Sequence, residues 1–216
     1  MSEIQAPQWR IDEWFQVLER QSRDKMRIFH DEIHKYNRTL NLISAKTLPF
    51  TDAIHFADSI LGSQLIHQSQ PDMTRIYDLG SGSGFPGLIF AILYSKVEVV
   101  LVEADQKKCE FLNHVIDQLQ LKNVKVLNQQ IETLEPNSVR FCMARGLSTI
   151  SKSILLTRKI VPVGGVFFHF KGENWSAEVG EIPTQLCSVW MPALVGDYKL
   201  PVGPLRFGVV KTDKIA

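Results

Sequence analysis

Apolar and polar residues alternate with a helical period in the first third of the chain. Over residues 9–42, apolar residues recur at spacings of three and four, with charged residues of both signs between them. This spacing is typical of one amphipathic helix. A second helix is expected over residues 51–66, where His55 and Asp58 share a face. A histidine and an aspartate three residues apart on a helix are typical of a hydrogen bond at the protein surface.

Short apolar runs then alternate with helical segments, which predicts an α/β core. The runs expected to form strands are residues 75–79, 97–103, 124–127, 141–144, 165–170, 186–191 and 205–211. Between them we expect a helix over residues 106–119 capped by Asp105, and a later helix capped by Ser148. The pattern predicts a mostly parallel seven-stranded sheet over residues 71–216, preceded by a helical extension over residues 1–70.

A glycine-dense turn, residues 80–87, follows the first expected strand and precedes a helical run. Its glycines fit two patterns, because Gly82, Gly84 and Gly87 match the dinucleotide pattern G-x-G-x-x-G. The pattern D-x-G-x-G-x-G, which resembles the first motif of Rossmann-like S-adenosylmethionine methyltransferases, is matched by Asp78, Gly80, Gly82 and Gly84. An acid at the strand end attracts the ammonium of that cofactor and would repel a pyrophosphate. We therefore favour S-adenosylmethionine over NAD, and both over a plain turn without a ligand.

Other candidate residues follow the carboxyl ends of the later strands, the edge where ligands of such sheets bind. Glu103 lies about twenty residues beyond the glycine turn, where a carboxylate accepts hydrogen bonds from ribose hydroxyls. Ile131 is placed to cover an adenine, and Glu132 or the local backbone to bind its exocyclic amine. Arg145 ends the fourth strand and Lys171 the fifth. Arg145 is therefore a candidate for a functional role beside the cofactor.

A basic stretch, residues 34–46, ends the first helical region. Its basic and amide side chains surround one aromatic residue and have no acidic neighbours. Such a stretch suits contacts with a phosphate backbone, here through Arg38 and Lys46. The same pattern also fits a helix C-terminus whose cations complement the helix dipole.

Composition narrows the class of protein. The chain has 216 residues, 44% of them hydrophobic, and a net charge of +1, which suits one main domain and argues against a purely electrostatic nucleic-acid binder. Cys109, Cys142 and Cys187 have no metal-ligand spacing, so we expect reduced thiols and no metal. Without a leader pattern or an apolar run long enough for a membrane span, we expect a cytoplasmic protein.

Taken together, these features resemble the RsmG (GidB) family, bacterial methyltransferases that modify guanine N7 in 16S ribosomal RNA. The resemblance rests on Tyr36-Asn37, Leu40-Asn41-Leu42, His55-x-x-Asp58-Ser59, the 78–87 loop, Leu101-Val102-Glu103, Arg145 and Lys171-Gly172. It implies a Rossmann-like class I methyltransferase fold with S-adenosylmethionine as cofactor. The positions that it implies contact the cofactor are Gly80, Phe85, Ile131, Glu132 and Arg145, with Glu103 on the ribose.

The resemblance also implies the reaction and the partner. We expect a monomer that transfers a methyl group to guanine N7 of 16S rRNA, within the small ribosomal subunit or an assembly intermediate. Arg145 would orient the cofactor or the guanine, and Arg38, Lys46 and Lys171 would contact RNA phosphates. The alternatives are a catalytically silent RNA- or ribosome-binding module on the same fold and, less favoured, an NAD-dependent oxidoreductase.

Overall fold

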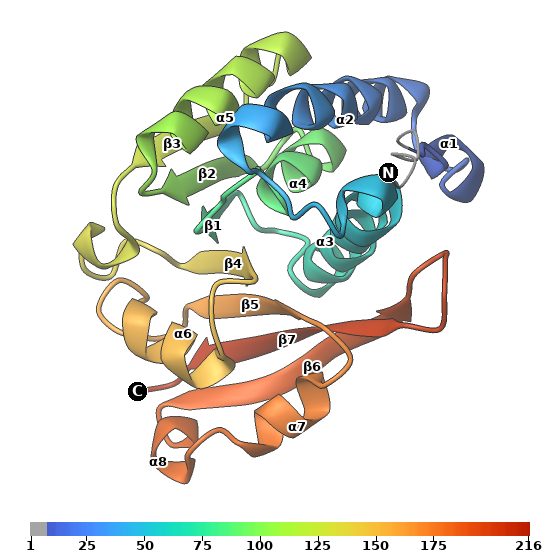
Figure 1. The fold of residues 1–216 in the computed structure, drawn as a ribbon. Coiled ribbons are helices and arrows are strands. Elements are labelled where there is room, and N and C mark those ends of the chain that lie inside the picture. Colours follow the sequence, from blue (N-terminus) through green and yellow to red (C-terminus); the bar gives the residue numbers. More distant parts are fainter. Residues whose placement is uncertain (1–7) are drawn as a thin grey trace.

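The computed structural model describes residues 8–216, which form one twisted sheet flanked by helices (Figure 1). The strands are β1 (Arg75–Leu79), β2 (Glu98–Glu103), β3 (Val124–Asn128), β4 (Phe141–Arg145), β5 (Val166–Lys171), β6 (Trp190–Lys199) and β7 (Arg206–Lys214). Their order is β3-β2-β1-β4-β5-β7-β6, and β1 to β5 run parallel. β7 is antiparallel to both β5 and β6. The predicted α/β fold with a mostly parallel seven-stranded sheet is confirmed.

Helices fill the connections between the strands and the segment before the sheet. They are α1 (Ile11–Trp14), α2 (Arg20–Leu40), η1 (Leu48–Phe50), η2 (Asp52–Ala57), α3 (Asp58–Ser69), α4 (Gly87–Leu93), α5 (Gln106–Leu119), η3 (Ile131–Thr133), α6 (Ile150–Thr157), α7 (Trp175–Gly180) and α8 (Thr184–Cys187). Here η1 and η3 are 3-10 helices and η2 is a π-helix. Across residues 8–216, none of the helices combines the length and apolarity needed to cross a membrane.

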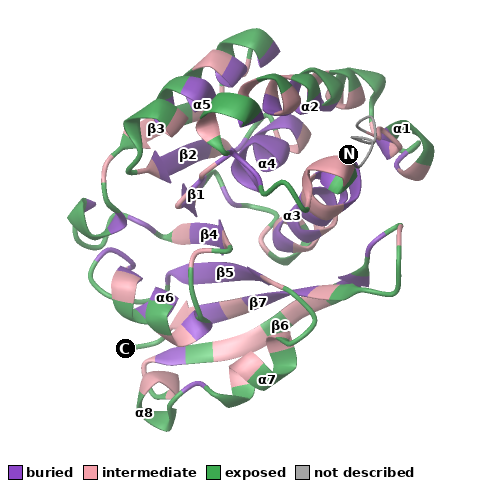
Figure 2. Cartoon of the chain, in the orientation of Figure 1, coloured by how far each residue is buried: buried purple, intermediate pink, exposed green. Residues whose placement is uncertain are grey.

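Two layers of buried apolar residues lie on opposite faces of the sheet. Figure 2 shows that the strands between them are largely buried. Successive residues of a strand point to opposite faces, so β2 contributes to both layers. Val99 and Leu101 join the layer formed with α2, α3, α4 and α5. Val100 and Val102 join the layer that contains η3 and α6. Burial on both faces explains why this strand reads as an unbroken apolar run.

The single helix predicted over residues 9–42 is wrong in its middle. The structure has a short α1 and a long α2, with a break between Trp14 and Arg20. Ile11 and Phe15 are buried, but Val17 is 92% exposed, so the apolar face does not continue through the break. The arginine before α1, Arg10, pairs with the buried Asp52 of η2, which fixes α1 against a later segment of the chain.

The second predicted helix, residues 51–66, is correct in place but differs in form. It begins with the π-helical turns of η2, which continue into α3. π-helical turns are rare and occur frequently at functional sites. Here the carbonyl of Ile54 in η2 accepts a hydrogen bond from the side chain of Arg145. A helical period in the sequence does not distinguish these two helix types.

At the C-terminal end, the strand predicted over residues 186–191 is mostly wrong. Leu186 lies in the short helix α8, and β6 begins only at Trp190. A short apolar run fits a buried helix turn as well as a strand. The predicted cap Ser148 is also wrong, because Thr149 accepts from Lys152 N at the start of α6. The predicted cap Asp105 is confirmed, with a 3.1 Å bond from Lys108 N.

The helices before the sheet share a core with the sheet domain. Met26, Phe29 and Ile33 of α2 are fully buried in the same cluster as Phe90 of α4. The division at residue 70 into an extension and a core domain stays a prediction, and residues 1–7 of that extension lie outside the described residues.

Candidate active site

The carboxyl ends of the parallel strands meet at one edge of the sheet. The strand order reverses between β1 and β4, which makes this pair the switch point where open α/β sheets bind ligands. The glycine turn follows β1, and Arg145 is the last residue of β4. Glu103 ends β2 beside them. The fold therefore brings the main predicted site residues to the same edge.

The glycine turn connects β1 to α4 through backbone that suits glycine. Gly80, Gly82 and Gly84 have φ values of 72°, 55° and 96°, a region that other residues rarely adopt. The N–H groups of Gly80 and Ser81 donate to the carbonyl of Val102 in β2. The loop is thereby fixed to the neighbouring strand. A Cβ at Gly84 would come within 2.6 Å of Leu88, so the loop also packs closely on α4.

Asp78 lies beneath this loop rather than at its surface. Its carboxyl is 1% exposed, and one oxygen, Oδ2, accepts from Gly87 N at 3.1 Å. The other oxygen, Oδ1, is buried without a hydrogen-bond partner in the described part of the chain. Burial raises the pKa of Asp78 to about 7, against the opposing hydrogen bond from Gly87 N. We expect its attraction for a bound cation to act electrostatically through the loop.

Glu103 holds the outer side of the same loop. Its Oε2 accepts from Gly82 N at 2.8 Å, and its Oε1 accepts from Asp105 N at 2.9 Å. A carboxylate has about four acceptor positions, so two remain for ligand hydroxyls. The side chain is only partly buried, which leaves it open to a ligand.

Arg145 connects the strand edge to η2 and α3. Its Nη1 donates to Ile54 O and to Asp58 Oδ2, both at 3.1 Å, and its Nη2 donates to His55 Nδ1 at 2.7 Å. The guanidinium also lies 5.2 Å from the centre of the Phe85 ring in the glycine turn. Of its five N–H donors, two have no partner among residues 8–216 and are available to a ligand.

His55 acts in this arrangement as a neutral acceptor. Burial and the charge of Arg145 lower the pKa of His55 to about 2. Because Nδ1 accepts from Arg145, the ring proton is on Nε2, which donates to Thr47 Oγ1 at 3.1 Å. The His55 ring also stacks on Phe85 with centres 5.4 Å apart. His55 thus links the arginine to the loop that follows α2.

Asp58 completes the arrangement and is 3% exposed. Its Oδ2 accepts from Arg145, and its Oδ1 accepts from the hydroxyl of Tyr198 at 2.7 Å. The predicted surface hydrogen bond between His55 and Asp58 is therefore wrong, because both bind Arg145 instead. In the sequence, only the motif H-x-x-D-S indicated that His55 and Asp58 belong to the site. No sequence pattern indicated Tyr198, which is 140 residues away from Asp58.

A hollow of about 430 Å³ opens beside Arg145. It is lined by Ile54, His55, Asp58, Arg145, Gly146, Phe170, Lys171, Gly172 and Phe207. Phe207 and Arg145 contribute an aromatic ring and a guanidinium to this lining, together with the buried carboxylate of Asp58. Phe170 is only 4% exposed, because its ring packs on Gly62 of α3. Such a lining suits a flat polar ring that needs both stacking and hydrogen bonds.

The adenine-side candidates lie after β3. Ile131, in η3, is buried in the apolar layer that contains Val100 and Val102. Glu132 is exposed and lines a different hollow together with residues of α6. Their contacts with an adenine stay predictions.

The three cations predicted for RNA contacts differ in their surroundings. Arg38 lies in the last turn of α2 and is exposed, as is Lys46 in the following loop. Lys171 is partly buried, and its Nζ donates to Ser148 O at 2.7 Å and to Glu178 Oε1 at 2.8 Å. Lys171 is thus held by an ion pair, whereas no ion pair engages Arg38 or Lys46 in the described chain.

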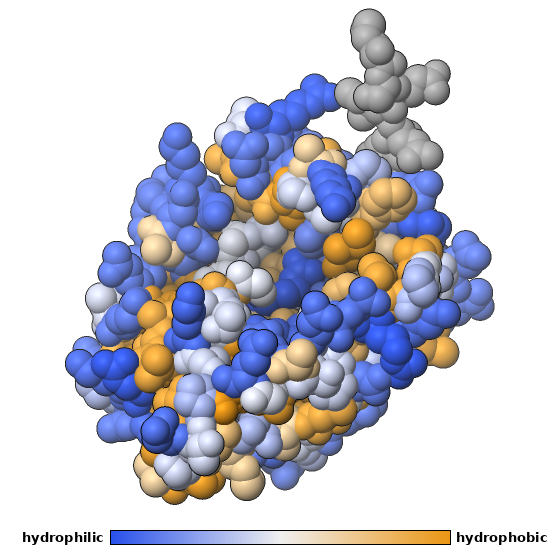
Figure 3. Space-filling model, turned by 60° about the horizontal axis from the view of Figure 1, so that its bottom comes forward, coloured by the Kyte–Doolittle hydropathy of each residue, from blue (hydrophilic) through white to orange (hydrophobic). Residues whose placement is uncertain are grey.

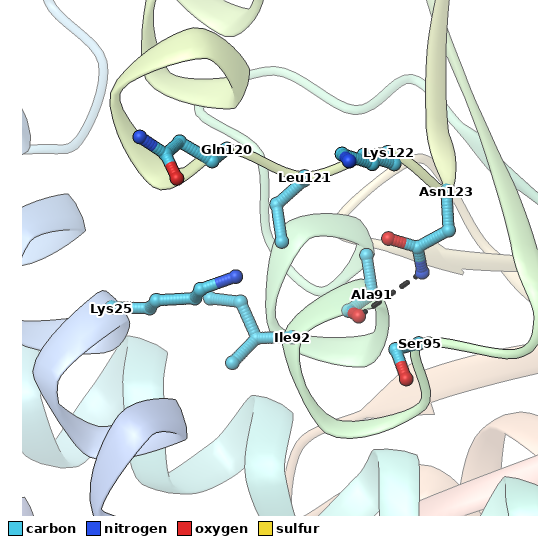
Figure 4. Close-up of a pocket in the computed structure, with 8 residues that line it drawn as sticks. All are labelled: Lys25, Ala91, Ile92, Ser95, Gln120, Leu121, Lys122 and Asn123. Carbon is cyan, nitrogen blue, oxygen red and sulfur yellow. Dashed lines mark hydrogen bonds between the residues drawn. The ribbon is translucent and has the colours of Figure 1, made fainter.

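Other surface hollows lack this chemistry. The hollow in Figure 4, about 310 Å³, lies between α2, the end of α4 and the loop before β3. Its lining includes Lys25 and Lys122 but no carboxylate. Figure 3 shows a hollowed area near the middle of one face of the molecule, bordered by both hydrophilic and hydrophobic residues. The carboxyl edge remains the candidate site because it combines a glycine turn, acidic groups and an arginine.

These residues fit S-adenosylmethionine. A Cβ at Gly82 would meet no atom closer than 3.8 Å, so the loop backbone there is uncovered, and the unpartnered oxygen of Asp78 is buried beneath the loop. Glu103 has acceptor capacity for ribose hydroxyls. The positive charge of S-adenosylmethionine is therefore matched by the carboxylate of Asp78, and its ribose by the carboxylate of Glu103. The uncovered loop backbone leaves room for the ligand between them.

The pKa of Asp78 predicts how cofactor affinity depends on pH. The carboxyl gains its charge as the pH rises through about 7, and only the charged form attracts the ligand ammonium. We expect affinity for S-adenosylmethionine to rise about tenfold between about pH 6 and pH 7.5. Calorimetric titration of the wild-type protein and of Asp78→Asn measures this change. A slope that persists in Asp78→Asn would show that another group causes it.

Comparisons with known proteins agree with this geometry. The model of the GidB family, rRNA small subunit methyltransferase G, matches residues 22–190. The ribosomal RNA small subunit methyltransferase G 3 of Bdellovibrio bacteriovorus is 64% identical over 96% of this chain and 94% of its own length. The ribosomal RNA small subunit methyltransferase G of Paracoccus denitrificans is 34% identical over 69% and 76%.

The fold is also similar to solved structures with little sequence identity. A predicted O-methyltransferase from Agrobacterium tumefaciens has a TM-score of 0.57 at 20% identity, over 74% of this chain and 81% of that chain. At this identity the likeness concerns the fold alone.

Proposed function

The chain belongs to the rRNA small subunit methyltransferase G family, and on this premise we propose that it transfers a methyl group from S-adenosylmethionine to guanine N7 of 16S rRNA. The observation that carries the proposal is the position of Arg145. It lies between the glycine turn, through Phe85, and the hollow lined by Phe170 and Phe207. The arginine therefore contacts both the predicted cofactor site and the space for a base.

In this proposal the residues of the β1–α4 turn hold the cofactor. Gly80, Gly82 and Gly84 present the backbone, and Glu103 accepts from the ribose hydroxyls. Phe85 contacts the cofactor, while Ile131 and the backbone near Glu132 contact the adenine. When bound, S-adenosylmethionine supplies an electrophilic methyl group on a sulfonium.

We assign the guanine to the hollow of about 430 Å³ beside Arg145. The ring of Phe207, which is partly exposed, offers a stacking surface to the base. The two available N–H donors of Arg145 suit O6 of guanine, a carbonyl oxygen with two lone pairs, which leaves the lone pair of N7 free to attack the methyl group. The neutral state of His55 avoids a second positive charge beside the reacting base.

The reaction requires no general base. Guanine N7 has an in-plane lone pair and no proton, so the residues need only position it for attack. Positioning of two reactants can supply about 7 to 11 kcal/mol of a reaction barrier. Positive charge develops on the guanine as the methyl arrives, and the carboxylate of Asp58 lies at the edge of the hollow to stabilise it.

The RNA partner would lie across the exposed cations near the site. Arg38 and Lys46 are exposed and suited to phosphate contacts, and Lys171 contributes charge from within its ion pair. The net charge of +1 supports a substrate that also offers shape, such as RNA folded within the small subunit or an assembly intermediate. We propose that the enzyme acts on it as a cytoplasmic monomer.

Two other functions are less supported. A silent RNA-binding module would have no need for the glycine turn with its unpartnered acid, which here remains intact. An NAD-dependent oxidoreductase would place a pyrophosphate close to Asp78, which disfavours it when that carboxyl is charged.

Methyl transfer from labelled cofactor tests the proposal. Small ribosomal subunits and deproteinised rRNA, both from cells without this gene, would be incubated with the protein and the modified base identified. We expect label as 7-methylguanosine, with more on the subunit than on free RNA. Cofactor binding without label on either substrate would contradict the proposed target.

A further inference from the structure

Tyr198 joins the C-terminal hairpin to the Arg145 site. Its hydroxyl donates to Asp58 Oδ1 at 2.7 Å, while the other oxygen of that carboxylate accepts from Arg145 at 3.1 Å. Tyr198 lies in β6, beyond residues 22–190 that the family model matches. We propose that Tyr198 is a positioning residue for methyl transfer, whose hydroxyl orients Asp58 so that Asp58 fixes Arg145 above Phe85. This inference rests on the proposed function.

The hydrogen bond between Tyr198 and Asp58 is buried, so its loss would not be compensated by water. Asp58 and Tyr198 are 3% and 8% exposed, so water does not readily replace a missing hydroxyl. With one donor on each oxygen, the carboxylate has a defined rotation about its Cβ–Cγ bond. Without the tyrosine hydroxyl, Oδ1 would be left as an unsatisfied buried acceptor, and the carboxyl would rotate or take up a proton. Either change weakens the bond to Arg145.

The hairpin that carries Tyr198 is itself fixed to the site. Tyr198 is opposite Phe207 in the β6–β7 register, and Phe207 lines the hollow beside Arg145. On the same hairpin, Gly196 lies against Leu65 of α3, where a Cβ would come within 2.9 Å of that side chain. One strand pair therefore supports both the arginine and one wall of the hollow.

The pKa of Asp58 distinguishes a positioning role of Tyr198 from a purely structural one. The titratable and charged groups that face it are Arg145 from β4 and Tyr198 from β6, while His55 from η2 faces Arg145 and is neutral. Burial raises the pKa of Asp58, and the hydrogen bonds from Tyr198 and Arg145 oppose this rise. Loss of the tyrosine hydroxyl must raise the pKa of Asp58 further.

Replacement of Tyr198 by phenylalanine tests the proposal. The ring remains, so we expect a folded protein whose kcat is about ten- to a hundredfold lower, with the KM for RNA little changed. Because charged Asp58 is the active form, activity is lost as the pH falls through its pKa. The acid limb of the pH profile should therefore move to higher pH in Tyr198→Phe. The matched control is Tyr94→Phe, since Tyr94 stacks on His67 away from the site.

A second variant, Asp58→Asn, tests the proposal without relying on Tyr198→Phe alone. If Tyr198 acts through Asp58, adding Tyr198→Phe to Asp58→Asn should lower kcat by less than twofold further. NMR titration of the Asp58 carboxyl carbon in the ligand-free protein should also show a higher pKa in Tyr198→Phe. This measurement needs no turnover.

The outcomes separate the two hypotheses. Wild-type kcat and an unchanged acid limb in Tyr198→Phe would overturn the positioning role, as would fully additive losses with Asp58→Asn. A rate that falls equally at every pH, with an unchanged carboxyl pKa, would also overturn it. If the wild-type protein methylates no rRNA, the proposed function fails, and the NMR titration still decides whether Tyr198 controls Asp58.

Discussion

Replacement of Arg145 by alanine is expected to lower kcat for methyl transfer by about a thousandfold. The guanidinium supplies the two donors that we assign to the substrates, and removal of a preorganised donor costs about a hundred- to a thousandfold in rate. It also connects η2 to the glycine turn through His55 and Phe85. Single-turnover kinetics with saturating RNA and cofactor would measure the loss separately from binding.

The same substitution should also destabilise the protein. It leaves the buried Asp58 without its cation, and breaking a buried ion pair in this way costs about 3 to 5 kcal/mol. Arg145→Lys keeps the charge but not the planar set of donors, so it should preserve more stability than activity. Arg145→Ala with undiminished methyl transfer would contradict the assigned role.

The second large effect is expected from Gly87→Ala. A Cβ at Gly87 would lie 2.5 Å from Asp78 Oδ2 and would also overlap the side chain of Leu101. The carboxyl, the strand and the start of α4 cannot all keep their places, and such overpacking costs about 1 to 3 kcal/mol. We expect the melting temperature to fall by about 2 to 12 °C. Cofactor affinity should fall as well, because the loop would shift.

The matched control is Gly180→Ala at the end of α7. Nothing lies within 4 Å of a Cβ there, so this variant should melt at the wild-type temperature or slightly above it. Calorimetry would measure the melting temperatures of both variants. The comparison shows the effect of one added methyl group where space is filled, at Gly87, and where it is open, at Gly180. Equal melting temperatures for Gly87→Ala and the wild type would show that the loop can adjust.

Local signals were sufficient to predict the sheet and the glycine turn. Strands such as β1 and β2 are short apolar runs, and their burial on both faces is a local property of the sequence. The proximity of Glu103 to the turn could be predicted because parallel strands bring their carboxyl ends to one edge. The structure adds the 2.8 Å bond from Gly82 N to Glu103 Oε2.

The contacts of Arg145 could not be predicted in this way. Its partner Asp58 is 87 residues away, and Tyr198 is a further 140 residues along the chain from Asp58. Contacts of this kind depend on how α3 and the hairpin pack on the sheet, for which the helical period carries no information. The break between α1 and α2 was missed for a similar reason, since the pairing of Arg10 with Asp52 is long-range.

The position of β7 between β5 and β6 sets an order for assembly during synthesis. β6 pairs with β7 and not with β5, so it has no neighbouring strand until residues 206–214 have left the ribosome. Until then β5 also presents an open edge, which is a site for aggregation. The contact between Tyr198 and Asp58 can therefore become stable only after residues 206–214 are made. A nascent or prematurely terminated chain would contain the glycine turn and Arg145 but not the hydrogen bond from Tyr198 to Asp58.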